Sequence, residues 1–159
     1  MALESRASAR LMGFKDMAKT QMKVLIVEAR FYNDIVEEMV QGAIAHLEEK
    51  GVAYERMPVP GAFEIPGVIA MTLKQGQYAG FVALGCVIRG ETTHYDYVCG
   101  ESARGLMDLS VHHGAAVGNG IITVENRDQA WARASRDKKN KGRDAAEACL
   151  RMIEIKGEF

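Results

Sequence analysis

Short apolar runs alternate along the chain with longer stretches in which apolar residues recur at helical spacing. Residues 24–27 are an apolar run, and after Asn33 apolar side chains recur every three or four positions over residues 36–47. This pattern predicts a strand followed by a helix. Gly51 is placed to end that helix, because glycine readily adopts the left-handed conformation found just past helix ends. A second strand is predicted over residues 54–59.

The same pattern continues to the end of the chain. Residues 61–66 form a predicted turn, which leads into a short helix. Residues 81–88 are almost continuously apolar, as expected of a strand in a parallel sheet with helices on both faces. The remaining predicted elements are a helix, a strand and two helices, over residues 95–113, 120–124, 127–135 and 142–155.

Strands and helices therefore alternate, with connections of only a few residues. This order predicts an α/β protein, a three-layer α/β/α sandwich around a four-stranded parallel sheet. The chain has 159 residues, which suffices for one hydrophobic core. We expect residues 23–159 to form one domain and residues 1–22 to be a partly ordered N-terminal arm.

Composition narrows the function classes. Twenty basic and twenty-one acidic residues give a net charge of -1, which predicts no nucleic-acid partner and no anionic membrane surface. No apolar run is long enough for a membrane span, and the N-terminus lacks a signal-peptide core. The three cysteines form no CxxC pair, which favours reduced thiols in a cytoplasm. We predict no metal and no cofactor, since metal-ligand spacing and dinucleotide or nucleoside-triphosphate motifs are absent.

Candidate site residues follow the predicted strands. In open parallel sheets ligands bind outside the carboxyl ends of the strands. The segments that reach this edge are residues 29–31, 61–64, 89–94 and 125–126.

Residues 89–94 offer backbone N–H groups, a helix N-terminus and hydroxyls, all of which suit a phosphate. The alternative is that Thr92 or Thr93 merely caps the helix. His94 titrates near neutrality and is a candidate general acid-base group, although an isolated histidine is often structural. His46, with the other histidines, is expected at helix surfaces or ends.

Aromatic and acidic residues share this edge. Phe31 and Phe63 suit stacking on a flat heterocycle, or else ordinary packing under a loop. Glu64 suits a hydrogen bond to a polyol hydroxyl, or else the first turn of its helix. Cys86 and His94 form a conceivable nucleophile pair, although a free cysteine is usually a small apolar residue.

Three motifs occur together in the order PGAFEIP (60–66), GCVIRGETTHY (85–95) and TVEN (123–126), the last followed by Gln129-Ala130 and Arg133-Ala134. Together they closely resemble the lumazine synthase family, over the chain from about Lys23 onward. The resemblance implies a flavodoxin-like fold. It also implies a riboflavin-pathway transferase, which condenses 5-amino-6-(D-ribitylamino)uracil with 3,4-dihydroxy-2-butanone 4-phosphate. The product is 6,7-dimethyl-8-ribityllumazine, and phosphate and water are released.

The resemblance also implies roles for individual residues. His94 would transfer protons. The phosphate would be held by Gly90, Glu91, Thr92 and Arg133. The pyrimidine and its ribityl chain would be bound by Phe31, Ala62, Phe63, Glu64, Cys86, Val87, Ile88 and Asn119. Because Asn119 and Arg133 would come from the adjacent subunit, the family likeness implies a homopentamer with active sites at subunit interfaces.

Two positions depart from the family pattern. Asn119 stands where many members have a bulky ring, and Tyr32 follows Phe31 where Asn is common. An alternative function is therefore a weakly active paralogue that mainly binds a flavin or lumazine. A receiver domain of the same fold is disfavoured, because Glu28 is the only acid that ends the first strand.

Overall fold

Four short segments form one parallel sheet in the computed structural model, which describes residues 22–158. The strands are β1 (Lys23–Ala29), β2 (Ala53–Val59), β3 (Gly80–Ile88) and β4 (Val117–Val124). Their order in the sheet is β2-β1-β3-β4, and all pairs are parallel. The predicted four-stranded parallel sheet is confirmed. The arm predicted over residues 1–22 lies, except for Met22, outside the described residues.

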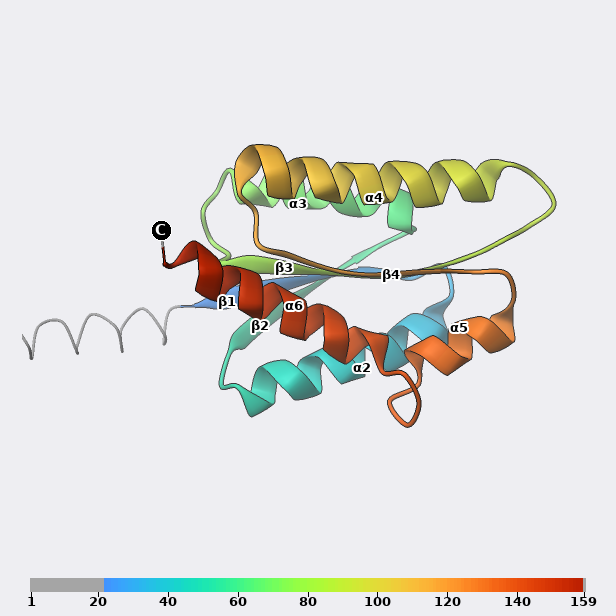
Figure 1. Cartoon of the computed structure of the whole chain (residues 1–159), viewed down its shortest axis with the longest axis horizontal. Coiled ribbons are helices and arrows are strands. Elements are labelled where there is room, and N and C mark those ends of the chain that lie inside the picture. The colour runs from blue at the N-terminus through green and yellow to red at the C-terminus, as the bar shows by residue number, and fades with distance from the viewer. Residues whose placement is uncertain (1–21, 159) are drawn as a thin grey trace, which may run out of the picture.

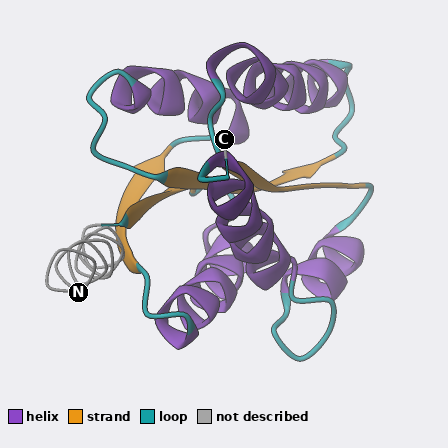
Figure 2. Ribbon diagram, turned by 60° about the vertical axis from the view of Figure 1, so that its left-hand side comes forward, coloured by secondary structure: helices purple, strands orange, loops and turns teal. Residues whose placement is uncertain are grey.

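Helices cover both faces of the sheet, so that the fold has three layers (Figure 1). On one face lie α2 (Asn33–Glu49), α5 (Arg127–Ala134) and α6 (Lys141–Lys156). On the other lie η1 (Ala62–Glu64), α3 (Ile65–Leu73) and α4 (His94–His113). The view along the layers in Figure 2 shows the same separation. The predicted three-layer α/β/α sandwich is therefore confirmed.

Two hydrophobic clusters lie back to back across the sheet. In β1, Val24 and Ile26 pack toward α2 and α6, whereas Leu25 and Val27 pack toward α3 and α4. Side chains of a strand alternate between faces, so a strand covered on both faces must be apolar at nearly every position. This explains the continuous apolar run of β3, which is buried along almost its whole length.

Two local predictions need correction. β4 begins three residues earlier than the predicted residue 120, because Val117, Gly118 and Asn119 are also part of the strand. His46, expected at a helix surface or end, does lie in the last turn of α2, but its side chain is buried, with its Nδ1 3.5 Å from a Glu49 carboxylate oxygen. It lies on the part of α2 that other elements cover, since α6 packs across α2 in addition to the sheet.

The helix α6 packs against β4 through glycine. A Cβ atom added at Gly118 would overlap the carbonyl oxygen of Ala145 in α6. Gly120 is similarly confined, by the side chains of Leu84 and Ala145. The backbones of strand and helix therefore approach more closely than a side chain between them would allow.

We predict that Gly118→Ala lowers the free energy of unfolding by about 1–3 kcal/mol or more, since the methyl group must displace backbone. The matched control is Gly67→Ala in α3, where an added Cβ meets nothing within 4 Å. That change should leave stability equal or raise it by up to about 1 kcal/mol, because alanine favours helix. Urea unfolding measures both variants, and equal effects would contradict the close approach of α6.

Candidate active site

A cleft of about 490 Å³ opens at the carboxyl edge of the sheet. This volume falls in the usual range for small-molecule sites. Three predicted segments meet there: the turn after β1, the turn after β2 and the segment at the end of β3. The predicted site residues that line the cleft are Phe31, Ala62, Phe63, Glu64, Cys86, Val87, Ile88, Gly90, Thr92 and His94.

The turn between β1 and α2 presents an uncovered aromatic ring to the cleft. Phe31 is 75% exposed, and its ring meets Tyr32 edge-on with centroids 4.9 Å apart. Phe63, in η1, is also largely exposed. Neither ring lies in the two core clusters of the described chain, so ordinary packing under a loop does not account for them. Both are free to contact a planar ligand or a neighbouring subunit.

The turn after β2 forms the second wall. Ala62 is buried against the sheet side of the cleft, whereas Glu64 is exposed. Glu64 stands at the N-cap position of α3, but its side chain accepts no capping hydrogen bond there. Its carboxylate therefore remains an acceptor for hydroxyl groups, although a negative charge at this helix start is favourable in any case.

The loop before α4 ends in a helix N-terminus that is only lightly capped. Thr93 occupies the N-cap position without a side-chain capping bond. The hydroxyl of Thr92 accepts a long hydrogen bond of 3.3 Å from the His94 N–H. Helix N-termini leave backbone N–H groups without intrahelical partners, and these groups attract anions. Threonine capping therefore leaves backbone N–H groups at the start of α4 available to a phosphate.

Arg89 holds this loop through contacts with Glu125 and Tyr95, a role that sequence reasoning missed. Its Nε donates to Glu125 at 2.8 Å, and its guanidinium lies 4.2 Å from the Tyr95 ring centroid. The hydrogen bond to Glu125 is the main reason why the pKa of Arg89 is raised. Tyr95 itself lines the cleft, together with Tyr32, Val98 and Gly61, of which only Gly61 belongs to a segment predicted to reach this edge. Val98 could have been found from the sequence, because it lies on the apolar face of the helix predicted over residues 95–113.

Two predicted residues lie elsewhere. Asn119 and Arg133 line a second hollow of about 450 Å³ along β4, the edge strand. The Asn119 side chain accepts from the Ile121 N–H at 3.0 Å, and Arg133 donates to the Gln129 carbonyl at 3.0 Å. Glu91 lines neither cavity. One chain therefore brings neither Asn119 nor Arg133 to the cleft that holds His94.

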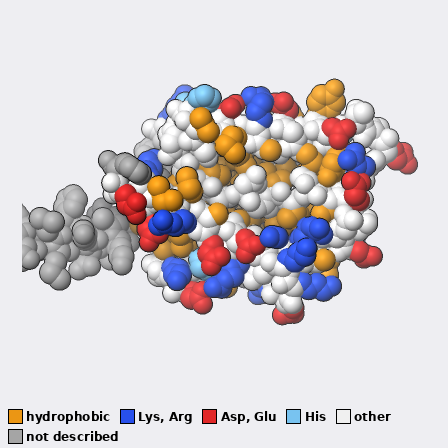
Figure 3. All heavy atoms as spheres, viewed as in Figure 1, with side chains coloured by type: hydrophobic (Ala, Val, Ile, Leu, Met, Phe, Trp, Pro, Cys, Tyr) orange, Lys and Arg blue, Asp and Glu red, His pale blue; other side chains and the backbone are white. Residues whose placement is uncertain are grey.

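Hydrophobic side chains gather on the face that carries β4. In Figure 3 they form a band between α4 and α6, with Lys and Arg side chains near the start of α6. Within residues 22–158, no strand pairs with the outer edge of β4. No helix in the same range is long and apolar enough to cross a membrane. The described part of the chain also holds no group of three or more His, Cys, Asp or Glu placed to bind a metal.

The fold and the cleft define a flavodoxin-like α/β protein that presents a small-molecule site with an anion-binding helix start at the carboxyl edge of its sheet. Comparison with known proteins identifies the family within this class. The profile of the 6,7-dimethyl-8-ribityllumazine synthase family matches residues 21–157. The chain belongs to this family.

Individual relatives agree. A 6,7-dimethyl-8-ribityllumazine synthase of Bartonella bacilliformis is 56% identical over 138 residues, covering 86% of this chain and 91% of that protein. One of Afipia carboxidovorans is 57% identical over 142 residues, covering 86% and 87%. The 6,7-dimethyl-8-ribityllumazine synthase 1 of Rhizobium meliloti is 55% identical over 146 residues, covering 88% and 95%. The family resemblance seen in the sequence is confirmed.

Cys86 is poorly suited to nucleophilic catalysis. It lies in the buried strand β3, and burial raises the pKa of its thiol to about 12. Only about 10⁻⁴ of such a thiol is ionised at pH 8, and the thiolate is the reactive form. The Cys86/His94 nucleophile pair is therefore disfavoured.

We predict that iodoacetamide at pH 8 modifies the half-buried Cys99 well before Cys86 or Cys149. Burial also raises the pKa of Cys149 to about 12. Labelling of Cys86 should accelerate as pH rises toward that value, because the thiolate fraction grows. Peptide mass spectrometry follows each site, with urea-unfolded protein as the control in which all three react. Fast native labelling of Cys86 would restore the thiol as a candidate nucleophile.

Proposed function

We propose that the protein catalyses the synthesis of 6,7-dimethyl-8-ribityllumazine in riboflavin biosynthesis. Its substrates would be 5-amino-6-(D-ribitylamino)uracil and 3,4-dihydroxy-2-butanone 4-phosphate, and phosphate and water would be released. Family membership supports the reaction. The observation that carries it to this chain is the convergence of aromatic rings, a helix N-terminus and His94 on one cleft.

The cleft suits the pyrimidine substrate. Phe31 and Phe63 offer aromatic faces to a flat heterocycle, and offset ring contacts add to the area they bury. The buried end of β3, at Cys86, Val87 and Ile88, provides an apolar floor. Ala62 leaves room for the ribityl chain, and the Glu64 carboxylate would accept hydrogen bonds from its hydroxyls.

Phosphate binding and proton transfer are the two remaining tasks of the site. The start of α4, with Gly90, Glu91 and Thr92 in the preceding loop, would hold the phosphate of the ketose. When the pyrimidine amine attacks the ketose carbonyl, a C–N bond forms and a proton must move from nitrogen to the departing oxygen. His94 is the first residue of α4 and would therefore lie beside the bound phosphate, where its imidazole would carry these protons. Positioning and proton transfer account for the steps without a cofactor.

We further propose that the site is shared between subunits of a ring-shaped homopentamer. Asn119 and Arg133 line a hollow on the open edge of β4, away from the cleft of their own chain. A head-to-tail contact, in which different surfaces of two copies meet, generates a ring when the rotation between copies closes. Such a contact would bring one subunit's Arg133 to the phosphate of the next and Asn119 to its pyrimidine.

We also propose that the reaction takes place in the cytoplasm. All three cysteines are free in the fold. Unpaired thiols are typical of reducing compartments.

A direct test of the reaction is a coupled assay with both substrates, followed by absorbance of the lumazine product. Product formation above the uncatalysed rate would support the enzyme. Tight lumazine or flavin binding without turnover would instead favour the binding protein considered as the alternative. The relatives described above are all named synthases, so they give that alternative no support.

We predict that His94→Ala slows product formation by about 10- to 1,000-fold, which is less than the roughly 10²- to 10⁴-fold that one general acid-base group contributes. Spontaneous condensation of the substrates should reduce the apparent loss. The matched control is His112→Ala, an exposed histidine at the other end of α4. Steady-state kinetics compare the two variants, and full turnover by the His94 variant would remove this residue from the mechanism.

We predict that Arg133→Ala raises the KM for the ketose phosphate more than the KM for the pyrimidine. A charge-assisted hydrogen bond of about 1.5–3 kcal/mol corresponds to a loss in affinity of roughly 10- to 150-fold. Arg151→Ala is the control, since this exposed arginine of α6 pairs only with Glu154 among the described residues. Equal increases in both KM values would contradict the phosphate assignment.

Mixing inactive subunits tests the shared site directly. If His94 and Arg133 act across an interface, rings assembled from equal parts of the two variants regain intact sites at about one interface in four. Light scattering confirms that the mixed particles are pentamers. If both residues served the same subunit's site, mixing would restore nothing.

A further inference from the structure

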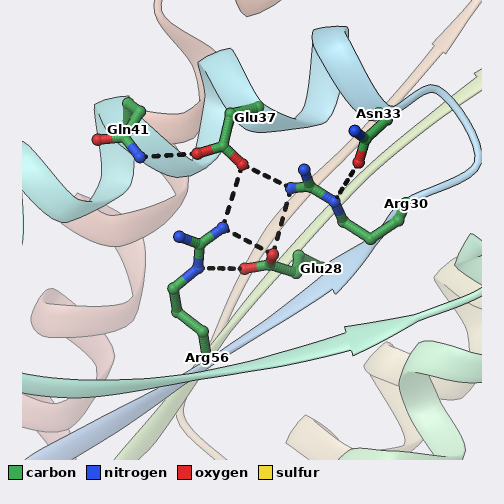
Figure 4. Close-up of polar contacts among 6 residues, drawn as sticks. All are labelled: Glu28, Arg30, Asn33, Glu37, Gln41 and Arg56. Atoms are coloured by element: carbon green, nitrogen blue, oxygen red, sulfur yellow. Dashed lines mark hydrogen bonds and ion pairs between the residues drawn. The ribbon is translucent and has the colours of Figure 1, made fainter.

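A buried carboxylate follows the apolar run of residues 24–27 in strand β1. Glu28 is only 3% exposed. Two guanidinium groups approach it, Arg56 from β2 at 2.8 and 2.9 Å and Arg30 at 3.2 Å (Figure 4). A buried charge is strongly unfavourable unless it is paired and hydrogen-bonded. The two arginines meet that requirement here.

The contacts extend into α2 and form a closed cluster. Glu37 accepts from Arg30 at 2.8 Å and from Arg56 at 3.1 Å, so each arginine contacts both carboxylates. Gln41 donates to Glu37, and this bond, together with the two arginines, holds the pKa of Glu37 below its usual value. Two positive and two negative charges therefore link β1, β2 and α2, as Figure 4 shows.

Arg30 connects this cluster to the turn that carries Phe31. Its Nε donates to the side-chain oxygen of Asn33 at 2.7 Å, so the bond spans the two residues between them. Its backbone N–H donates to the carbonyl of Val59 in β2 at 2.9 Å. The turn is thus tied on both sides of Phe31 and Tyr32, although the Phe31 ring itself is largely exposed.

We propose that Glu28 is a positioning residue, which holds Arg30 against Asn33 and so fixes the turn that presents Phe31 to the cleft. The effect on substrate binding rests on the proposed function. The effect on the turn does not. Glu28 acts through Arg30 and touches no substrate, because its side chain is buried against the two arginines and does not line the cleft.

Hydrogen exchange tests the turn without any substrate. Glu28→Gln keeps the shape of the side chain but removes the charge that both arginines contact. We expect the amides of Arg30 and Val36, which donate to the carbonyls of Val59 and Tyr32, to exchange faster in this variant, whereas the centre of β3 is unchanged. The matched control is Glu55→Gln, which removes a carboxylate paired with Lys23 near the amino-terminal end of the same two strands.

Kinetics test the consequence for the site. Glu28→Gln should raise the pyrimidine KM about two- to tenfold, the range that corresponds to one aromatic contact. The ketose phosphate KM should stay within about twofold, since the phosphate loop lies at α4 and is not tied to this cluster. Glu55→Gln should change neither value. If Glu28 only stabilised the fold, Glu28→Gln would lower the melting temperature and leave both KM values unchanged.

A second variant covers the case in which Glu28→Gln does not fold. Asn33→Ala removes only the acceptor of the Arg30 bond, at an exposed position. It should also raise the pyrimidine KM alone. If both variants fold, the double variant should lose less than the product of the two single effects, because both act on one contact.

The outcomes separate the two proposals. An inactive wild-type protein, together with faster exchange of the Arg30 and Val36 amides in Glu28→Gln, would overturn the proposed function and support the role of Glu28. An active wild type whose Glu28→Gln and Asn33→Ala variants match Glu55→Gln in exchange and in both KM values would overturn the role of Glu28. Equal increases of the pyrimidine KM and the ketose phosphate KM in Glu28→Gln would also overturn the role of Glu28.

Discussion

The parallel pairing of β3 with both β1 and β4 is the constraint on which the other features of this protein depend. Parallel neighbours require a crossover between them, and each crossover here is a helix that covers one face of the sheet. All four strands therefore end at the same edge, and the turns after them bring polar groups together there without entering the core. The cleft lies at this edge.

Most of the fold could be predicted because its signals are local. The apolar run of β3 is continuous because that strand is buried on both faces. The helical spacing in α2 arises because only one side of that helix is buried. The start of β4 could not be predicted, because Gly118 resembles a turn residue until α6 is seen to pack against it. His46 was misjudged for a similar reason, since helix-on-helix packing widens the buried stripe of α2.

The candidate site divides in the same way. Phe31, Glu64 and His94 follow predicted strands, so their convergence on one edge could be expected before the structure. Residue chemistry offered candidate roles for these three, and the family likeness chose among the alternatives. The roles of Asn119 and Arg133, which lie on another surface of the chain, come from the likeness alone. The partners of Glu28 could not be inferred, since pairing across 28 residues of sequence depends on the register of β1 with β2.

The four charges beside the Phe31 turn respond to heat differently from the apolar packing around them. The hydration of charged groups becomes less favourable as temperature rises, so the penalty for burying an ion pair falls while hydrophobic stabilisation levels off. The contacts of Glu28 and Glu37 with Arg30 and Arg56 should thus weaken less on warming than the surrounding apolar contacts. On heating, the aromatic wall of the cleft is expected to keep its geometry longer than the packing of α6 on the sheet.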